Sequence, residues 1–308
     1  MFRKVWSTPM VPASILMGCA LSTAVVPAAI AADAPRATST LSATQIADRN
    51  VAARGGLDAW RNIHAMTLSG KLAAGGNQRA TIAAPERRPN SSIVPPRPAE
   101  EVMLPFVMEL KRPGKMRLEL QFNGQTAVQV FDGSNGWKLR PFLNRRVVEP
   151  YTAEELKIAS MQSDLDGPLV DYSAKGTRVD LDGTEKVDGR DNYKLKLTMK
   201  NGQVLHVWID TQTFLETKIE GAARKLDGVY HPVEIYFQDY RPVAGLQIPY
   251  LLETKVLPAS QKATAVREPA IPPEKTTIEK VEINPKLEDV AFTKPQVEVA
   301  STIARSNK

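Results

Sequence analysis

The stretch from Tyr193 to Glu220 constrains the fold most, because it contains a complete β-meander. Apolar and polar residues alternate with a period of two, which predicts strands with one buried and one solvated face. Asn201-Gly202 separates the first two strands and favours a type I′ hairpin turn, since both residues tolerate a positive φ. Residues 210–213 turn the chain again into a third strand. The alternating apolar side chains of the first two strands are Tyr193, Leu195, Leu197 and Met199, and then Leu205, Val207 and Ile209.

The same alternation recurs along the rest of the chain. It begins at Met66, makes four short strands between Phe106 and Leu139, resumes at Thr177 and ends at Ile283. Glycines beside Asn or Asp mark the turns, which indicates a meander and not a βαβ repeat. We expect about 10 to 12 antiparallel strands in one curved sheet, because strand twist bends or closes a sheet of that width. The predicted fold is a mainly β, incomplete barrel.

Two helices are predicted from capping boxes, in which the side chains of the cap and of the third helical residue bond each other's backbone. Ser42 and Gln45 open a helix that reaches Arg54, and Thr152 and Glu155 open a second that reaches Met161. Residues 57–63 predict a further short helical turn. Two helices cover only part of so many strands, so we expect them to form a lid over the barrel.

The domain boundaries follow from composition. Residues 1–31 have a basic start, an apolar run and a small-residue cleavage site at Ala29-Ile30-Ala31, which is typical of a signal peptide. We expect a linker over 32–41 and one domain over 42–292. That domain carries a Pro- and Arg-rich loop at 74–101 and a Pro-rich linker at 258–275. Residues 293–308 are predicted to be a disordered tail.

The signal peptide predicts export to the periplasm. Two fates remain open for the mature chain, because Leu16-Met17-Gly18-Cys19 partly resembles a lipoprotein cleavage box. Cleavage near Ala31 releases a cysteine-free protein, whereas acylation of Cys19 anchors it to the outer membrane. Beyond the N-terminal segment no apolar run reaches the roughly 18 residues of a transmembrane helix, so we expect peripheral membrane contact or none.

No pattern in the sequence predicts an enzyme. The three histidines, His64, His206 and His231, lack metal-ligand spacing, and no nucleophile elbow, Walker loop or dinucleotide-binding glycine pattern is present. We therefore expect no catalytic residue, no metal and no cofactor. The net charge is +6, but basic and acidic residues are interspersed, which does not favour a nucleic-acid partner.

The apolar strand faces are the remaining candidate site. A barrel of this strand number has an interior that is hard to fill, so either the helices fill it or a cavity remains for a hydrophobic ligand. Core packing is the alternative role for each residue. The predicted cavity-wall residues are Met116, Leu118, Leu120, Val128, Val130, Leu195, Leu197, Leu205, Val207 and Ile209.

Several motifs resemble those of LolA/LolB-like proteins, the periplasmic carriers that sort lipoproteins to the outer membrane. The resemblance covers roughly residues 50–292. The motifs are Gly55-Gly56-Leu57 with Trp60 and Met66 to Gly70, Lys111 to Arg117, Phe131-Asp132-Gly133 with Gly136-Trp137, Trp208-Ile209-Asp210 with Thr213 to Leu215, Asp239-Tyr240-Arg241 with Ile248-Pro249, and Val281 to Pro285.

The resemblance implies an incomplete antiparallel barrel with a helical lid over a hydrophobic cavity. It also implies a non-enzymatic carrier that binds lipoprotein acyl chains or another lipid. The alternative is an interaction or sensor module of the cell envelope with a filled barrel, bound to other envelope proteins and either free or anchored through Cys19.

Overall fold

The structure is a computed structural model that describes residues 41–75, 101–141, 145–226, 228–259 and 271–296. The elements are α1 (Ala43–Ala53), α2 (Leu57–Arg61), β1 (Ala65–Gly75), β2 (Glu101–Lys111), β3 (Lys115–Phe122), β4 (Gln125–Phe131), β5 (Gly136–Arg140), β6 (Arg145–Pro150), α3 (Ala153–Gln162), β7 (Arg178–Val187), β8 (Arg190–Thr198), β9 (Val204–Asp210), β10 (Glu216–Leu226), β11 (Val229–Val243), β12 (Leu246–Val256), β13 (Glu274–Ile283) and the 3₁₀ helix η2 (Asp289–Phe292).

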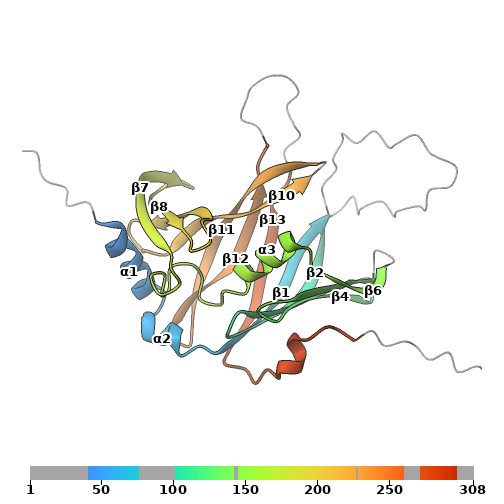
Figure 1. Ribbon diagram of the computed structural model, residues 1–308. Coiled ribbons are helices and arrows are strands. Elements are labelled where there is room, and N and C mark those ends of the chain that lie inside the picture. Colours follow the sequence, from blue (N-terminus) through green and yellow to red (C-terminus); the bar gives the residue numbers. More distant parts are fainter. Residues whose placement is uncertain (1–40, 76–100, 142–144, 227, 260–270, 297–308) are drawn as a thin grey trace, which may run out of the picture. The chain divides into compact units, whose positions relative to one another are not determined.

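All thirteen strands of the described residues form one open antiparallel sheet, in the order β6-β5-β4-β3-β2-β1-β13-β12-β11-β10-β9-β8-β7 (Figure 1). The sheet consists of two meanders, β1 to β6 and β7 to β13. Pairing of β1 with β13 joins them, while α3 and the segment 163–177 connect them along the chain. The predicted fold class is confirmed.

The strands differ from the prediction at two places. β6 was missed, because its sequence Arg-Arg-Val-Val-Glu-Pro does not alternate. Asp182-Gly183, a glycine beside Asp, predicts a turn between two short strands, and this prediction is wrong. Arg178–Val187 form the single strand β7, whose register shifts between Leu181 and Thr184, so that Gly183 lies in a β-bulge at φ +102°.

The hairpin at Asn201-Gly202 is confirmed, but the predicted turn type is wrong. Gly202 has φ +81° while Asn201 keeps a negative φ, and the Asn201 side chain accepts a bond from the N–H of Gln203. The Met199 N–H bonds the Gln203 carbonyl, which makes a three-residue loop with a left-handed glycine. Positive φ at both turn residues occurs instead at Asn123-Gly124 and Asp188-Gly189.

Both predicted capping boxes are confirmed. Ser42 accepts a bond from the Gln45 N–H, and the Gln45 side chain bonds the Ser42 N–H. Thr152 and Glu155 make the same pair of bonds at the start of α3. A third helix, α2, lies within the predicted helical turn at 57–63.

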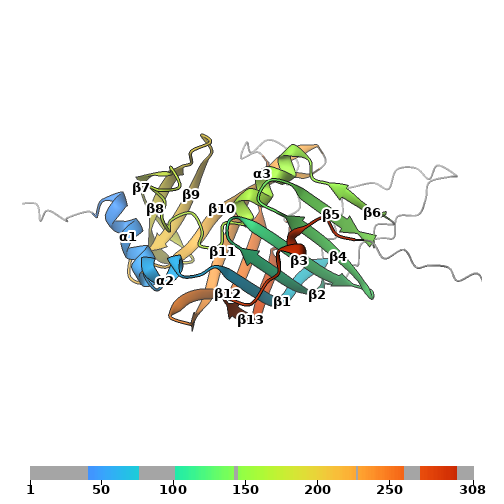
Figure 2. The same cartoon turned by 60° about the horizontal axis from the view of Figure 1, so that its bottom comes forward.

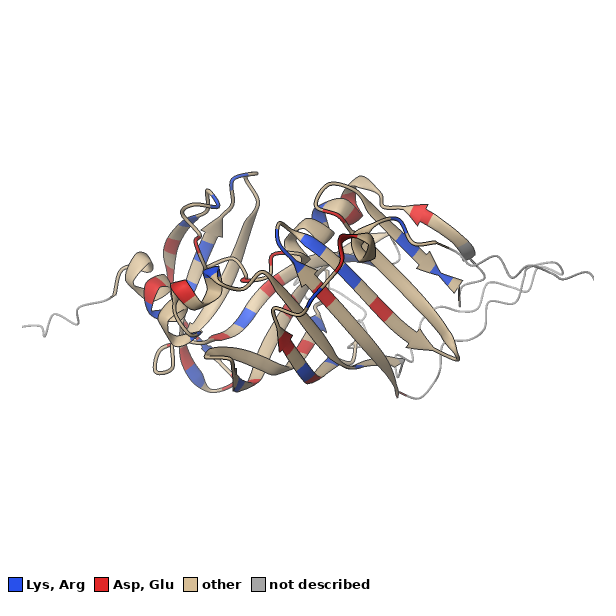
Figure 3. Cartoon of the chain, turned by 90° about the horizontal axis from the view of Figure 1, so that it is seen from below, with Lys and Arg blue, Asp and Glu red and all other residues tan. Residues whose placement is uncertain are grey.

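Burial divides the core into three clusters. The first lies beneath α2, α3 and the segment 163–177, against strands β1, β2, β3, β12 and β13. The second lies beneath α1, against β8 and β9. The third lies on the other face of β4, where η2 and the segment after β13 cover it; Figure 2 shows this dark-red segment crossing β3 and β5. Figure 3 shows the basic and acidic residues interspersed along the strands.

Several domain predictions lie wholly or mostly outside the described residues. These are the signal peptide at 1–31, the linker at 32–41, most of the loop at 74–101 and most of the tail at 293–308. The predicted linker at 258–275 is partly described, and its last two residues belong to β13, which begins at Glu274.

Candidate functional site

Five of the predicted cavity-wall residues lie in a closed core beneath α1. Ile46 and Ala47 of α1 have no exposed surface, and the strand residues that they cover are 0–5% exposed. Asn50 of α1 also donates a bond to the Phe214 carbonyl at 2.8 Å. A ligand could therefore contact these strand residues only after α1 is displaced. The five are Leu195, Leu197, Leu205, Val207 and Ile209.

The apolar surface beneath α3 is less completely covered. Met116 is buried at its base, but Leu118 and Leu120 of the same strand are partly exposed, as are neighbours on four other strands. We call this surface the α3 face. Its partly exposed apolar residues are Leu68, Leu72, Met108, Leu118, Leu120, Leu252, Val281 and Ile283.

Strand pairing makes the α3 face continuous. One cross-strand row runs from β13 to β3, and a second runs from β11 to β2 nearer the strand ends at 75 and 101. The members of each row lie directly opposite one another, so their side chains are in contact range. The first row is Val281, Leu68, Met108 and Leu118, and the second is Phe237, Leu252, Thr276, Leu72 and Leu104.

Val128 and Val130 lie on the opposite face of β4 from the α3 face. Phe131, their neighbour in β4, packs into the cluster beneath α3, so the alternation of the strand directs Val130 to the other side. There they pack beneath Phe292, which is 1% exposed. Strand alternation therefore separates these two predicted residues from Met116, Leu118 and Leu120.

Helix α3 is held mainly by its ends. Ala159 is its one buried residue. At its start, Glu155 forms an ion pair with Lys138 of β5, and the neighbouring Glu154 accepts a bond from the Tyr230 hydroxyl of β11. Near its end, the Met161 sulfur lies 3.2 Å from the Gln203 side-chain nitrogen, in the β8–β9 hairpin. The sheet is thus curved so that α3 contacts strands from both meanders.

The segment that follows α3 is held by a cluster of charged side chains. Lys175 bonds both oxygens of Asp164 at 2.8 Å and Asp166 at 3.0 Å, and Arg112 bonds Asp166 at 2.7 Å. Arg54, at the end of α1, donates to the Asp166 carbonyl and pairs with Glu216. The cluster therefore ties the segment 163–177 to α1, to β10 and to the β2–β3 turn.

The two aspartates of this cluster have opposite pKa shifts. Burial and the neighbouring Asp166 raise the pKa of Asp164 to about 6, although Lys175 works against this. Burial also acts to raise the pKa of Asp166, but bonds from Asp164, Arg112 and Lys175 outweigh it and hold this pKa at about 2. At neutral pH both aspartates are therefore ionised. The ionised form of Asp164 is disfavoured by burial and by the neighbouring charge of Asp166.

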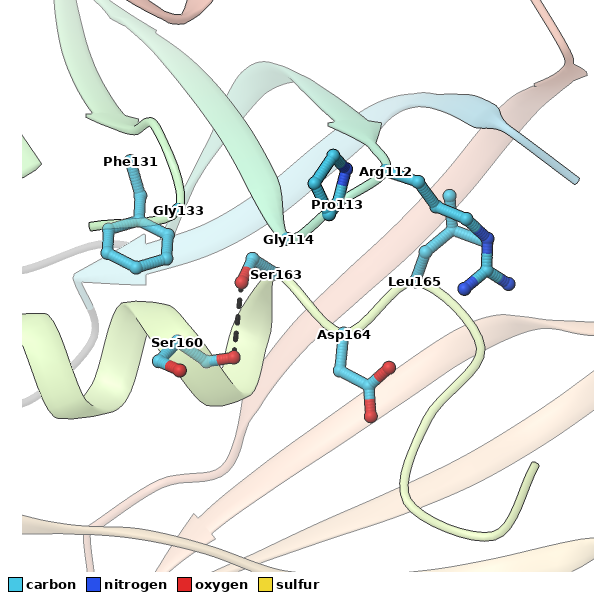
Figure 4. Close-up of a pocket in the computed structure, with 9 residues that line it drawn as sticks. All are labelled: Arg112, Pro113, Gly114, Phe131, Gly133, Ser160, Ser163, Asp164 and Leu165. Carbon is cyan, nitrogen blue, oxygen red and sulfur yellow. Dashed lines mark hydrogen bonds between the residues drawn. The ribbon is translucent and has the colours of Figure 1, made fainter. Parts of the chain in front are cut away.

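A cavity of about 420 Å³ lies at the C-terminal end of α3 (Figure 4). Phe131 and Leu165 form its apolar wall, and both pack into the cluster beneath α3. The Ser163 hydroxyl donates to the Ser160 carbonyl across its helical wall at 3.1 Å. The cavity thus adjoins the buried end of the α3 face.

A second cavity, of about 450 Å³, lies on the opposite face of the sheet. Val107, Val128 and Leu139 line it from the strands, and residues 290–296 form its other wall. Arg117 crosses this region, bonding the Ala291 carbonyl at 3.1 Å and pairing with Glu119.

The described part of the chain contains no group of three His, Asp, Glu or Cys residues arranged to hold a metal ion. His206 pairs with Glu220 at 2.9 Å, and His231 bonds the Leu257 carbonyl at 3.0 Å. Among the described helices none is long and apolar enough to cross a membrane.

No protein-family model matches the chain, and a search of curated proteins finds no match. Solved structures do match. A LolA superfamily protein from Nitrosomonas europaea is 13% identical, with 83% of this chain and 99% of that one covered and a TM-score of 0.48. A putative outer membrane lipoprotein-sorting protein domain from Vibrio parahaemolyticus is 13% identical, with 82% and 96% covered and a TM-score of 0.47.

A DUF1329 family protein from Desulfovibrio piger is 15% identical, with 82% of this chain and 98% of that one covered and a TM-score of 0.48. Proteins of the LolA superfamily are thus among the solved structures to which the chain is similar, as the sequence motifs predicted. At these identities the similarity concerns the fold.

Proposed function

We propose that the protein is a non-enzymatic carrier or binding protein that holds the acyl chain of a lipid on the α3 face. The observation that carries the proposal is the partial exposure of contiguous apolar side chains beneath a helix that buries one residue of its own. Each methylene removed from water on such a surface contributes about 0.8 kcal/mol, so even part of an acyl chain is held well.

The finer points of the proposal come from the sequence. The signal-peptide pattern at residues 1–31 supports action in the periplasm, and the LolA/LolB-like motifs support lipoprotein acyl chains as the cargo. Met116 is the buried floor of the proposed site, and Leu118 and Leu120 are its wall. The predicted residues beneath α1, and Val128 and Val130 beneath Phe292, support the fold in this proposal.

Binding of a fluorescent fatty acid to the purified protein tests this function. Leu118→Asp places a charge on the α3 face, and we expect it to weaken binding by at least about tenfold, since a carboxylate cannot be buried against an acyl chain without cost. Val290→Asp is the matched control, because Val290 is 74% exposed beside the cavity on the opposite face. Equal binding by both variants, or no acyl ligand in native mass spectrometry of the wild type, contradicts the proposal.

The closed cluster beneath α1 favours a second function, an interaction module whose core is filled. It predicts that acyl ligands do not bind, and that a cell-envelope protein does. Fatty-acid binding and affinity capture from envelope extracts, both with the wild type, separate the two, because a filled core predicts capture of a partner without acyl binding.

A further inference from the structure

The α3 face ends in polar side chains, all on the same side of the sheet. Thr254 lies two residues beyond Leu252 in β12, and Thr276 lies two residues before Ile278 in β13, so strand alternation places both hydroxyls on the α3 face. Glu274, at the start of β13, pairs directly with Thr254. We call Thr254, Thr276, Glu274 and Arg224 the polar rim.

Arg224 reaches the rim from β10 and crosses two intervening strands. Its two terminal nitrogens bond the two carboxylate oxygens of Glu274 at 2.6 and 2.8 Å. Because β11 and β12 lie between their strands, the two side chains must extend toward each other over the same face. The ion pair lies across that face, beyond Leu252. The Arg224 side chain is 40% exposed and the Glu274 side chain 30% exposed.

The rim is electrically neutral but capable of hydrogen bonding. In the bidentate ion pair, the negative charge of Glu274 compensates the positive charge of Arg224. The hydroxyls of Thr254 and Thr276 have no hydrogen-bond partner among the described residues. A group placed there therefore meets free hydroxyl donors and acceptors and a charge that is already compensated.

The length of the α3 face along the strands suits an acyl chain whose head-group end lies at the polar rim. Leu68 and Leu72 are the partly exposed apolar residues of β1, on either side of the buried Gly70, and lie about 13 Å apart at the strand rise of about 3.3 Å per residue. Half of a bilayer's hydrocarbon core is about 15 Å. A chain of membrane-lipid length that lies along the strands thus extends from the buried end of the face to Thr276.

We propose that the polar rim binds the uncharged ester or hydroxyl end of an acylated ligand, and that Thr254 and Thr276 select this end over a free carboxylate. The inference rests on the proposed function and adds the orientation of the ligand and the chemistry of its head. A free carboxylate at the same place faces Glu274 and displaces it from Arg224, whereas an ester or glycerol hydroxyl bonds the two threonines and leaves the ion pair intact.

Displacement of a fluorescent acyl probe by competitors of equal chain length tests this. The competitors are a monoacylglycerol, a fatty acid and a fatty amine. We expect the monoacylglycerol to bind the wild type most tightly. Thr254→Val and Thr276→Val keep the β-branched shape and should each weaken it by about 2- to 10-fold, the usual range for one neutral hydrogen bond. Thr277→Val is the control, because Thr277 is exposed on the opposite face of β13.

Glu274→Gln supplies a test in the opposite direction. It leaves Arg224 without its counter-charge, so we expect the fatty acid to gain affinity while the monoacylglycerol changes little. A wild type that prefers the fatty acid, or threonine variants with unchanged preference, overturns the inference and leaves the proposed function intact. If none of the competitors displaces the probe because the probe itself does not bind, the proposed function fails, and the inference fails with it.

Discussion

Helices α1 and α3 begin with the same type of capping box, but they cover the sheet in different ways. α1 buries Ile46 and Ala47 completely and closes the cluster beneath it. α3 buries Ala159 and leaves Leu118 and Leu120 partly exposed. The cap therefore determines where each helix starts, while the apolar residues that follow determine how firmly it packs. We therefore expect the α1 end of the sheet to contribute more to stability, and the proposed function has the ligand bind at the α3 end.

The largest expected effect comes from truncating a leucine in each region. Leu195→Ala removes a fully buried side chain beneath α1, and we expect the free energy of unfolding to fall by about 2–5 kcal/mol. Leu118→Ala should cost about 1 kcal/mol, since partial exposure reduces both the lost burial and the cavity. Urea unfolding followed by circular dichroism measures both. Equal losses would show that the two regions are packed alike.

The attachment of α3 to β5 is the next test. Lys138→Met removes the ion pair with Glu155 but keeps the length of the side chain, whose Nζ lies 2.6 Å from the second carboxylate oxygen. A charge-assisted bond contributes about 1.5–3 kcal/mol, so we expect amide hydrogen exchange in α3 to accelerate by about 10-fold or more.

Amides of α1 should be unchanged in Lys138→Met, because Lys138 does not contact that helix. Lys280→Met is the matched control, since Lys280 pairs with Glu282 of its own strand and is largely exposed. Acceleration in α1 as well as α3 would mean that the two helices open as one unit.

A smaller effect is expected from pH. The pKa of Asp164 is raised to about 6, so the folded protein binds a proton there more readily than the unfolded chain. Stability should therefore increase, by about 1 kcal/mol, as the pH falls from 7 to 5. Asp166 acts in the opposite sense, because its pKa is lowered to about 2, and its contribution is lost as the pH falls below 4.

Unfolding free energies at pH 7, 5 and 3 measure this dependence. Asp164→Asn should abolish the increase between pH 7 and 5 and leave the loss near pH 3. An increase that persists in this variant would assign the dependence to another group.

The smallest effect is expected at the exposed contact between α3 and β11. Tyr230→Phe removes the hydroxyl that bonds Glu154. Since both side chains are exposed, the exchange rate of α3 should change by less than about threefold. A change as large as that in Lys138→Met would show that the β10–β11 hairpin, and not β5, holds the helix.

Local features of the fold were predictable from the sequence. The two capping boxes, the hairpin turns and the apolar face of β8 and β9 depend on neighbouring residues, so their patterns are visible along the chain. β6 was missed because its residues do not alternate. The turn at Asn201-Gly202 has a different type from the one predicted, because Gly202 alone takes the left-handed conformation.

Which elements cover each face of the sheet was not predictable. Alternation shows that Val130 and Phe131 face opposite sides of β4, but not that η2 covers one side and α3 the other. The charged cluster was missed for a related reason. Arg54, Arg112 and Asp166 come from separate segments, and each alone resembles an ordinary surface residue.

Mapping a bound acyl chain tests the central claim most directly. A fatty acid or monoacylglycerol with a photoreactive group near the end of its chain can be crosslinked to the protein, and the labelled peptides identified by mass spectrometry. We predict labels on β1, β2, β3, β12 and β13, at residues 66–72, 104–120, 246–252 and 276–283. Labels on β8 and β9 beneath α1, or on residues 290–296 at the opposite face, would contradict the account.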